Sequence, residues 1–205
     1  MCDRETLTRS LYFRHACKRF DPERKLPEAD LRFILEAARL APSAFGMEAW
    51  RFLVIRDPEL KATLRPVCWD QPQITECSDL VVILGQIASV ADPEYYSAMF
   101  RRRGLSEEAT RAYIRRYEEY IGKLHSIQGW VAKQCYIAAD HMMVYASLIG
   151  VDSCPIEGFE PRKVDKILGL DRKKERSVLL LPLGYRLQEP REKKRRPFEE
   201  VVTFL

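Results

Sequence analysis

The sequence contains no C-x-x-C pair, and its six cysteines are far apart, at positions 2, 17, 68, 77, 135 and 154. Its three histidines, His15, His125 and His141, are equally scattered, so the spacing typical of a zinc site is missing. Isolated thiols of this kind favour reduced cysteines over a disulfide framework. We therefore predict a cytoplasmic protein without a metal site.

Long apolar runs are also missing. The first ten residues, MCDRETLTRS, are polar and charged, which does not fit a secretory signal. The longest apolar stretches are only as long as a β-strand, so we expect no membrane-spanning segment. Positive charge is in small excess, with 34 Lys and Arg against 30 Asp and Glu, a net charge of +4. This balance can favour an anionic ligand but does not demand nucleic acid.

Short apolar patterns of two kinds alternate along the chain, which predicts a single α+β domain. The segment 130–149 is apolar around most of its circumference, so we expect a long helix buried by its own domain or by a second subunit. The stretch 93–125 is strongly charged but interspersed with tyrosines, which predicts a helical insertion lying over the body of the fold. The predicted strands cover 50–55, 80–85, 151–154 and 177–184, and the other predicted helices cover 26–42, 59–67 and 161–168.

Four stretches could carry chemistry. RHACKRF (14–20) places three cations around one aromatic residue. A helical segment would aim Arg14 and Lys18 at one point, where the Arg14 guanidinium offers a fork of hydrogen-bond donors and the Lys18 ammonium a mobile positive charge. Each stretch alone also fits a plain structural role, as a solvated surface or a connection between elements. The other three are PSAFGMEAW (42–50), a loop with Ser43 and Gly46; CPIEGF (154–159), in which Gly158 permits unusual dihedral angles; and the basic tail REKKRRPF (191–198).

In their order and spacing, these stretches resemble the motifs of the nitroreductase family, the FMN-dependent NAD(P)H oxidoreductases. The family pattern is R-x-[ST]-x-[KR]-x-[FY], then P-S-x-x-x-x-[QE]-x-W, then P-[IM]-[EG]-G-[FY], and a basic pair near the end. The resemblance covers about residues 8–201. It implies a nitroreductase-like fold, with a central mixed sheet and flanking helices around a long buried helix. The insertion at 93–125 would belong to this single domain, and the basic tail would complete the flavin site.

The resemblance also implies roles for individual residues. Arg14 and Lys18 would approach the pyrimidine side of the flavin, where Lys18 would stabilise the negative charge of the reduced ring. The backbone amides of Glu157 and Gly158 would lie near flavin N5, so that Lys18 and Glu157 are the candidate catalytic residues. The implied cofactor-binding set is Arg14, His15, Ala16, Lys18, Asp70, Gln73, Pro155, Ile156, Glu157 and Gly158, with Lys193 and Arg195 on the 5′-phosphate and Ser43 reaching FMN from the other subunit of a homodimer.

Two positions depart from the family pattern. Ala16 stands where Ser or Thr is usual, which removes a hydroxyl that can bond the flavin, and Glu48 stands where Gln is frequent. The implied reaction passes a hydride from NADH or NADPH through flavin N5 to a small electron-poor acceptor, a nitroaromatic or a quinone, by a ping-pong mechanism. No G-x-G-x-x-G fingerprint is present, as expected if the nicotinamide binds only transiently over the flavin.

Three alternatives stay open at this point. A flavin reductase, a deiodinase-like protein or another flavin-dependent dehydrogenase would use the same fold, and a non-catalytic flavin carrier would bind FMN without reacting. A nucleic-acid-binding module could use the basic runs 101–103 and 193–196, but these lie far apart in the sequence. The sequence does not distinguish NADH from NADPH, nor does it identify the acceptor.

Overall fold

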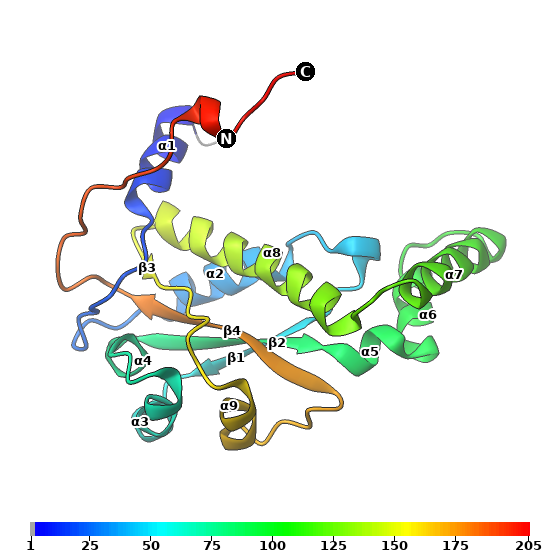
Figure 1. Ribbon diagram of the computed structural model, residues 1–205, viewed down its shortest axis with the longest axis horizontal. Helices are drawn as coiled ribbons and strands as arrows, with labels where there is room; N and C mark the ends of the chain where they lie inside the picture. Colours follow the sequence, from blue (N-terminus) through cyan, green and yellow to red (C-terminus); the bar gives the residue numbers. More distant parts are fainter. Residues whose placement is uncertain (1–2) are drawn as a thin grey trace.

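The computed structural model describes residues 3–205, and its centre is a four-stranded sheet with the order β1-β2-β4-β3 (Figure 1). This arrangement confirms the α+β class. The parallel part of the expected mixed sheet is reduced, among these residues, to an isolated bridge between Ala16 and Ser153. All neighbouring strands run antiparallel: β1 (Trp50–Ile55), β2 (Asp79–Gln86), β4 (Glu175–Gly184) and β3 (Asp152–Ser153).

Apolar side chains of β2 alternate between the two faces of the sheet, so both faces need to be buried. Helices cover each face and form a hydrophobic core with it. Val81 and Ile83 belong to one core, and Leu80 and Val82 belong to the other. The near-continuous apolar run of this strand therefore serves both layers. The covering helices are α2 (Glu28–Arg39) and α8 (Ile127–Leu148) on the first face, and α3 (Pro58–Leu64), α4 (Gln73–Glu76) and α9 (Pro161–Ile167) on the second (Figure 1).

The long helix α8 is buried on one side only. Small residues such as Ala138 and Ala146 let it pack closely in the first core. Tyr136, Ile137 and Tyr145 lie at different positions around the helix and are 37 to 40% exposed, with the Tyr145 ring 5.8 Å from that of Phe33 on α2. The chain itself therefore leaves part of the apolar surface of α8 exposed.

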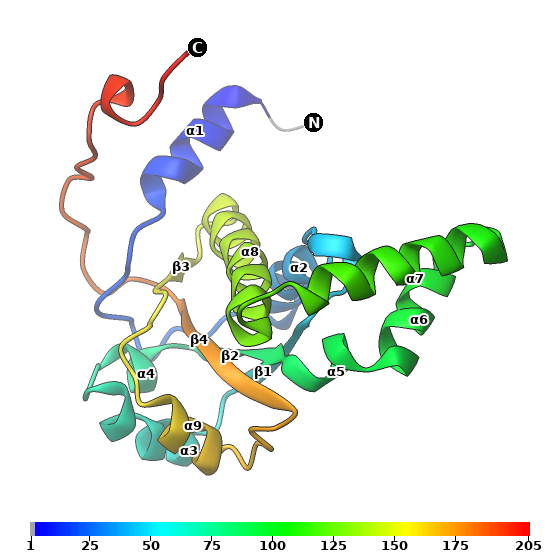
Figure 2. The same ribbon diagram turned by 45° about the vertical axis from the view of Figure 1, so that its right-hand side comes forward.

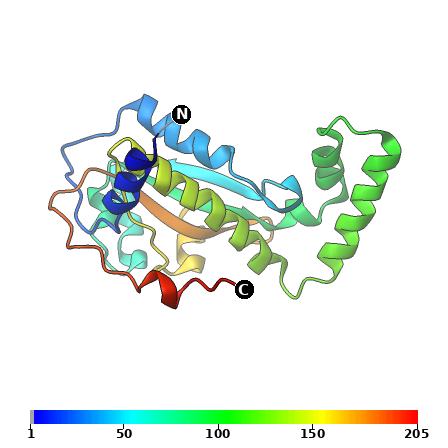
Figure 3. The same ribbon diagram turned by 90° about the horizontal axis from the view of Figure 1, so that it is seen from above.

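A helical arm projects from one end of the sheet (Figures 1 and 3). Tyr117 anchors it, because its ring lies 6.4 Å from that of Trp130 on α8 and its hydroxyl donates to the carbonyl of Val90 at 2.7 Å. The aromatic residues within this charged stretch thus form the attachment of the arm. The arm consists of α6 (Pro93–Arg101) and α7 (Glu107–Gly122), and α5 (Ile87–Ala91) connects it to β2.

The first helix and the C-terminal tail both lie on the side of the molecule away from the helical arm, near β3 (Figure 2). α1 (Arg4–Phe13) begins at Asp3, whose carboxylate accepts from the Thr6 amide at 2.7 Å. The tail after β4 returns to α1 and carries one short helical turn, η3 (Phe198–Glu200). None of the helices in residues 3–205 combines the length and apolar character that crossing a bilayer requires.

The strands and helices predicted from the apolar patterns are confirmed, with bounds that agree within about three residues. The sequence patterns did not predict α1, α4 or α5, nor the short turns η1 (Ala44–Gly46), η2 (Pro66–Cys68) and η3.

Candidate functional site

The expected helical geometry of RHACKRF is wrong. α1 ends at Phe13, and the motif continues as an extended segment held against the sheet. Ala16 bridges Ser153, and the Cys17 amide donates to the Ser153 carbonyl at 3.0 Å. Side chains two and four apart share one side of an extended segment, so Arg14 and Lys18 can still face the same space.

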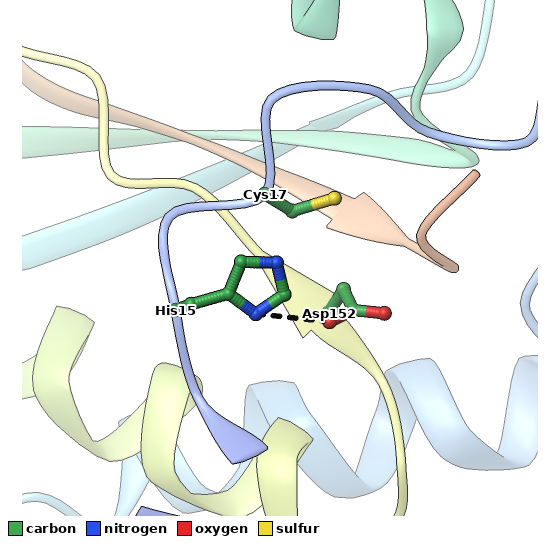
Figure 4. A group of neighbouring side chains, drawn as sticks. All are labelled: His15, Cys17 and Asp152. Carbon is green, nitrogen blue, oxygen red and sulfur yellow. Dashed lines mark ion pairs between the residues drawn. The ribbon is translucent and has the colours of Figure 1, made fainter. Parts of the chain in front are cut away.

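The other side of this segment is tied to β3 by buried polar groups. His15, Cys17 and Asp152 converge with their ligand-type atoms within 4.8 Å of one another (Figure 4). Asp152, however, accepts at both carboxylate oxygens from Arg186, and burial raises the pKa of Cys17 to about 12. A carboxylate already neutralised by a cation and a protonated thiol are poor partners for a metal ion. The cluster instead fastens the motif to the sheet.

The extended motif forms one wall of a hollow of about 710 Å³, and the basic tail forms the other. Lys193 joins the two walls, because its ammonium donates to the carbonyls of Leu11 and Arg14. The hollow therefore brings the first and the last of the four sequence stretches together. Six residues of the implied cofactor-binding set line it: Arg14, His15, Ala16, Lys18, Lys193 and Arg195.

The hollow is lined by more cations than carboxylates: Glu189 and Glu192 also line it, and Glu189 pairs with Arg186. Within residues 3–205, no carboxylate lies at ion-pair distance from Arg14, Lys18, Lys193 or Arg195. Burial, followed by the charges of Arg14 and Arg195, lowers the pKa of Lys193. Like charges gathered in this way are stabilised when an anion binds between them.

A thiol and an amide lie beside Lys18. The Lys18 ammonium is 3.7 Å from Cys154 Sγ, and the Gln73 amide nitrogen is 3.9 Å from the same sulfur. Burial raises the pKa of Cys154, with Lys18 acting in the opposite direction, so the thiol is protonated at neutral pH. The Gln73 side-chain oxygen is buried without a hydrogen-bond partner among the described residues. A buried acceptor left unpaired fits a place where a ligand donates.

The segment 154–159 passes between two aromatic side chains. Tyr136 donates a hydrogen bond to the Glu157 carboxylate, and Gln71 donates to the Gly158 carbonyl at 2.8 Å. A Cβ at Gly158 would lie 2.6 Å from Trp69, so only glycine allows this ring to rest on the backbone. The side chain of Trp69 is nevertheless 68% exposed. Sequence reasoning missed Trp69, although its position in WDQPQ beside Asp70 was a usable signal.

The remaining expected residues are distributed around this region. Pro155 and Ile156 precede Glu157 on the same segment, and the Ile156 amide donates to Leu180 on β4 at 2.8 Å. Asp70 has a positive φ of 53° and an exposed side chain. Ser43 does not line the hollow; it lies on the loop before β1, where the Ala44 amide donates to Gln134 of α8 at 2.8 Å. Six of the thirteen expected residues thus line the hollow, whereas Ser43, Asp70, Gln73 and the four residues 155–158 do not, and Glu157 lines a second hollow together with Tyr136.

Known proteins resemble this chain over its whole length. A family model described as the Nitroreductase family matches residues 11–185. A candidate NAD(P)H nitroreductase of Staphylococcus haemolyticus is 38% identical over 213 residues, which cover 98% of both chains. A solved nitroreductase-like protein from Streptococcus mutans has a TM-score of 0.89 at 23% identity and covers 99% of this chain and 100% of its own. A solved candidate nitroreductase from Exiguobacterium sibiricum, in complex with FMN, has a TM-score of 0.83 at 23% identity, covering 100% and 98%.

Proposed function

The chain belongs to the nitroreductase family, and from this premise we propose that it is an FMN-dependent oxidoreductase fed by NADH or NADPH. The observation that carries the proposal is the hollow between the RHACKRF segment and the basic tail. It collects four cationic side chains without carboxylate partners among the described residues. A flavin mononucleotide has the matching features, a terminal phosphate and a ring that becomes anionic on reduction.

The residues at this site fit FMN in three respects. Lys193 and Arg195 would hold the phosphate from the tail, and the lowered pKa of Lys193 supports a site that favours an added anion. Lys18 would place its charge beside the flavin ring, because no carboxylate of residues 3–205 neutralises it. The unpaired Gln73 oxygen would accept a hydrogen bond from the flavin or its ribityl chain.

Bound FMN would supply hydride acceptance from NADH or NADPH and hydride donation to an electron-poor acceptor such as a nitroaromatic or a quinone. The protein would position the flavin ring and supply the electrostatic field around it. Glu157 and Gly158 would present backbone amides to the reactive edge of the ring, and Tyr136 would fix this segment through the Glu157 carboxylate. Lys18 would stabilise the negative charge of the reduced ring without donating a proton.

We also propose that the working form is a homodimer in the cytoplasm, with FMN at the subunit interface. The exposed apolar residues of α8 support a second subunit, and Ser43, which lies outside the hollow, would reach the flavin site of that subunit. The five cysteines among the described residues are free and buried, which supports a reducing compartment. Cys2 lies outside the described residues.

The visible spectrum of the purified protein tests the function. We expect the absorption bands of oxidised FMN, and their loss when NADPH or NADH is added without oxygen. A yellow protein that neither nucleotide reduces would be a non-catalytic flavin carrier. A colourless protein that takes up no added FMN would contradict the proposal, and salt-sensitive binding to any duplex would then favour the nucleic-acid alternative.

A further inference from the structure

The loop between α2 and β1 has an unusual backbone conformation. Phe45, Gly46 and Glu48 have φ values of 55°, 60° and 46°, all in the left-handed region. For Phe45 and Glu48 this conformation is disfavoured by their Cβ atoms, and it persists only where surrounding contacts impose it. Hydrogen bonds within the loop and contacts from outside it constrain this conformation here.

The helical arm supplies the contacts from outside the loop. Arg103, just after α6, donates from Nη2 to the Phe45 carbonyl at 2.6 Å, and the Tyr95 hydroxyl of α6 donates to the Met47 carbonyl at 2.9 Å. The Phe45 ring packs against Tyr117 and Tyr120 of α7, with centroids 5.3 and 5.1 Å apart. The arm therefore holds both the backbone and the side chain of the loop.

Arg103 is itself held in place. Its guanidinium carbon lies 5.0 Å from the ring centroids of both Phe100 and Tyr113. These two aromatic faces favour a cation and fix the direction of its donors. The same guanidinium reaches within 3.2 Å of where a Cβ on Gly46 would lie, so the loop leaves space for it. Although Arg103 is exposed, this arrangement makes it a specific contact of the loop.

We propose that Arg103 is a positioning residue, which fixes the 43–48 loop so that Ser43 completes the flavin site of the partner subunit. Ser43 is coupled directly to the constrained backbone: its hydroxyl accepts from the Glu48 amide at 2.9 Å, and its carbonyl accepts from the Gly46 amide at 2.9 Å. Loss of the Arg103 contact frees the left-handed residues, and the Ser43 hydroxyl loses its orientation. The inference rests on the proposed function, because it concerns the same flavin site.

Three variants of the full-length protein test this inference. Arg103→Ala removes the contact, Arg103→Lys keeps a charge that can still donate to Phe45, and Arg101→Ala is a matched control with an exposed side chain on the same helical end. Hydrogen exchange of amides 44–48, measured without flavin, should accelerate in Arg103→Ala by about tenfold and stay unchanged in the control. Fluorescence titration should show FMN binding weakened by about tenfold, with recovery in Arg103→Lys.

The outcomes separate this inference from the proposed function. If exchange in the loop accelerates while the FMN affinity and the KM for a quinone acceptor match the wild type, the loop does not belong to the flavin site and the inference fails. Unchanged exchange would show that Arg103 does not hold the loop, which also overturns it. If the wild-type protein does not bind FMN at all, the proposed function fails, whatever the exchange experiment shows.

Discussion

At the residue scale, the hollow is defined by cationic side chains that have no carboxylate of residues 3–205 at ion-pair distance. Lys193 has its pKa lowered by burial and by Arg14 and Arg195, and its charged form persists only below that pKa. The FMN phosphate is largely a dianion above about pH 6. The attraction between the two should therefore begin to fall at a lower pH than it would for an ordinary lysine.

This pH dependence is the first prediction. Between about pH 7 and about pH 10, the affinity for FMN should fall relative to the affinity for riboflavin, which has no phosphate. Fluorescence titration of both flavins at each pH measures the ratio and cancels general effects of pH on the fold. In Lys193→Arg the ratio should stay flat, because arginine remains charged throughout this range. Parallel pH profiles for both flavins in the wild type would remove Lys193 from the phosphate site.

Lys18 gives the second prediction. Its ammonium contacts a protonated thiol at 3.7 Å, and no carboxylate of residues 3–205 neutralises it, so its charge is available to the flavin ring. Lys18→Ala should slow flavin reduction on the order of 10²-fold in anaerobic stopped-flow measurements, since one electrostatic partner of the reduced ring is lost. Lys18→Arg should retain most of the rate. A reduction rate in Lys18→Ala equal to the wild type would contradict this role.

At the scale of elements, the segment between β3 and α9 depends on one close approach. Gly158→Ala would place a Cβ 2.6 Å from Trp69 and force the ring or the segment to move. Because Trp69 is largely exposed, the thermal unfolding temperature should change little. We expect flavin reduction to slow by roughly 10²-fold, because displaced backbone amides in the segment 154–159 would no longer hold the flavin and the nicotinamide in the orientation that hydride transfer requires.

Gly122→Ala is the control for this third prediction, because no atom lies within 4 Å of the added Cβ. It should leave flavin reduction unchanged. If Gly158→Ala also leaves reduction unchanged, the segment 154–159 does not face the reactive edge of the flavin.

Much at this scale could be predicted from sequence, because periodicity is a local signal. The apolar run of β2 and the helical spacing in α2 each determine one element regardless of distant partners. The geometry of 14–20 could not be predicted in this way, since the bridge from Ala16 to Ser153 joins residues far apart in the sequence. The role of the arm was equally hidden, because the bond from Arg103 to Phe45 is specified by no local pattern.

The motifs carried information that periodicity could not, since they implied that the first and last stretches serve one flavin site, which stays a prediction. The structure brings Lys193 onto the carbonyl of Arg14, across almost the whole sequence. Trp69 was missed despite its position beside Asp70 in WDQPQ, because its contact with Gly158 depends on the left-handed backbone of Trp69 and Asp70, which the sequence alone does not specify.

At the scale of the whole molecule, exposed apolar residues support the proposed dimer. Tyr136, Ile137 and Tyr145 of α8 are partly exposed, and the loop with Ser43 lies apart from the hollow of its own chain. The fourth prediction is that light scattering shows a dimer that binds two FMN. Ile137→Glu should shift the protein toward monomer and weaken FMN binding, because it buries an unpaired charge in the interface. A wild-type monomer that binds FMN tightly would contradict this prediction.

The last prediction concerns turnover in the assembled protein. If NAD(P)H and the acceptor both react at the same flavin, they compete for one space and each turnover divides into two half-reactions. Initial rates measured at several concentrations of NAD(P)H and of a quinone should then give parallel double-reciprocal lines, the pattern of a ping-pong mechanism. Hydride transfer through the flavin would need no side-chain nucleophile. Cys17, with its pKa raised to about 12, stays protonated at neutral pH and is a poor nucleophile. Cys17→Ala should therefore keep the parallel pattern. Intersecting lines would mean that both substrates bind at once and that the acceptor has a site of its own.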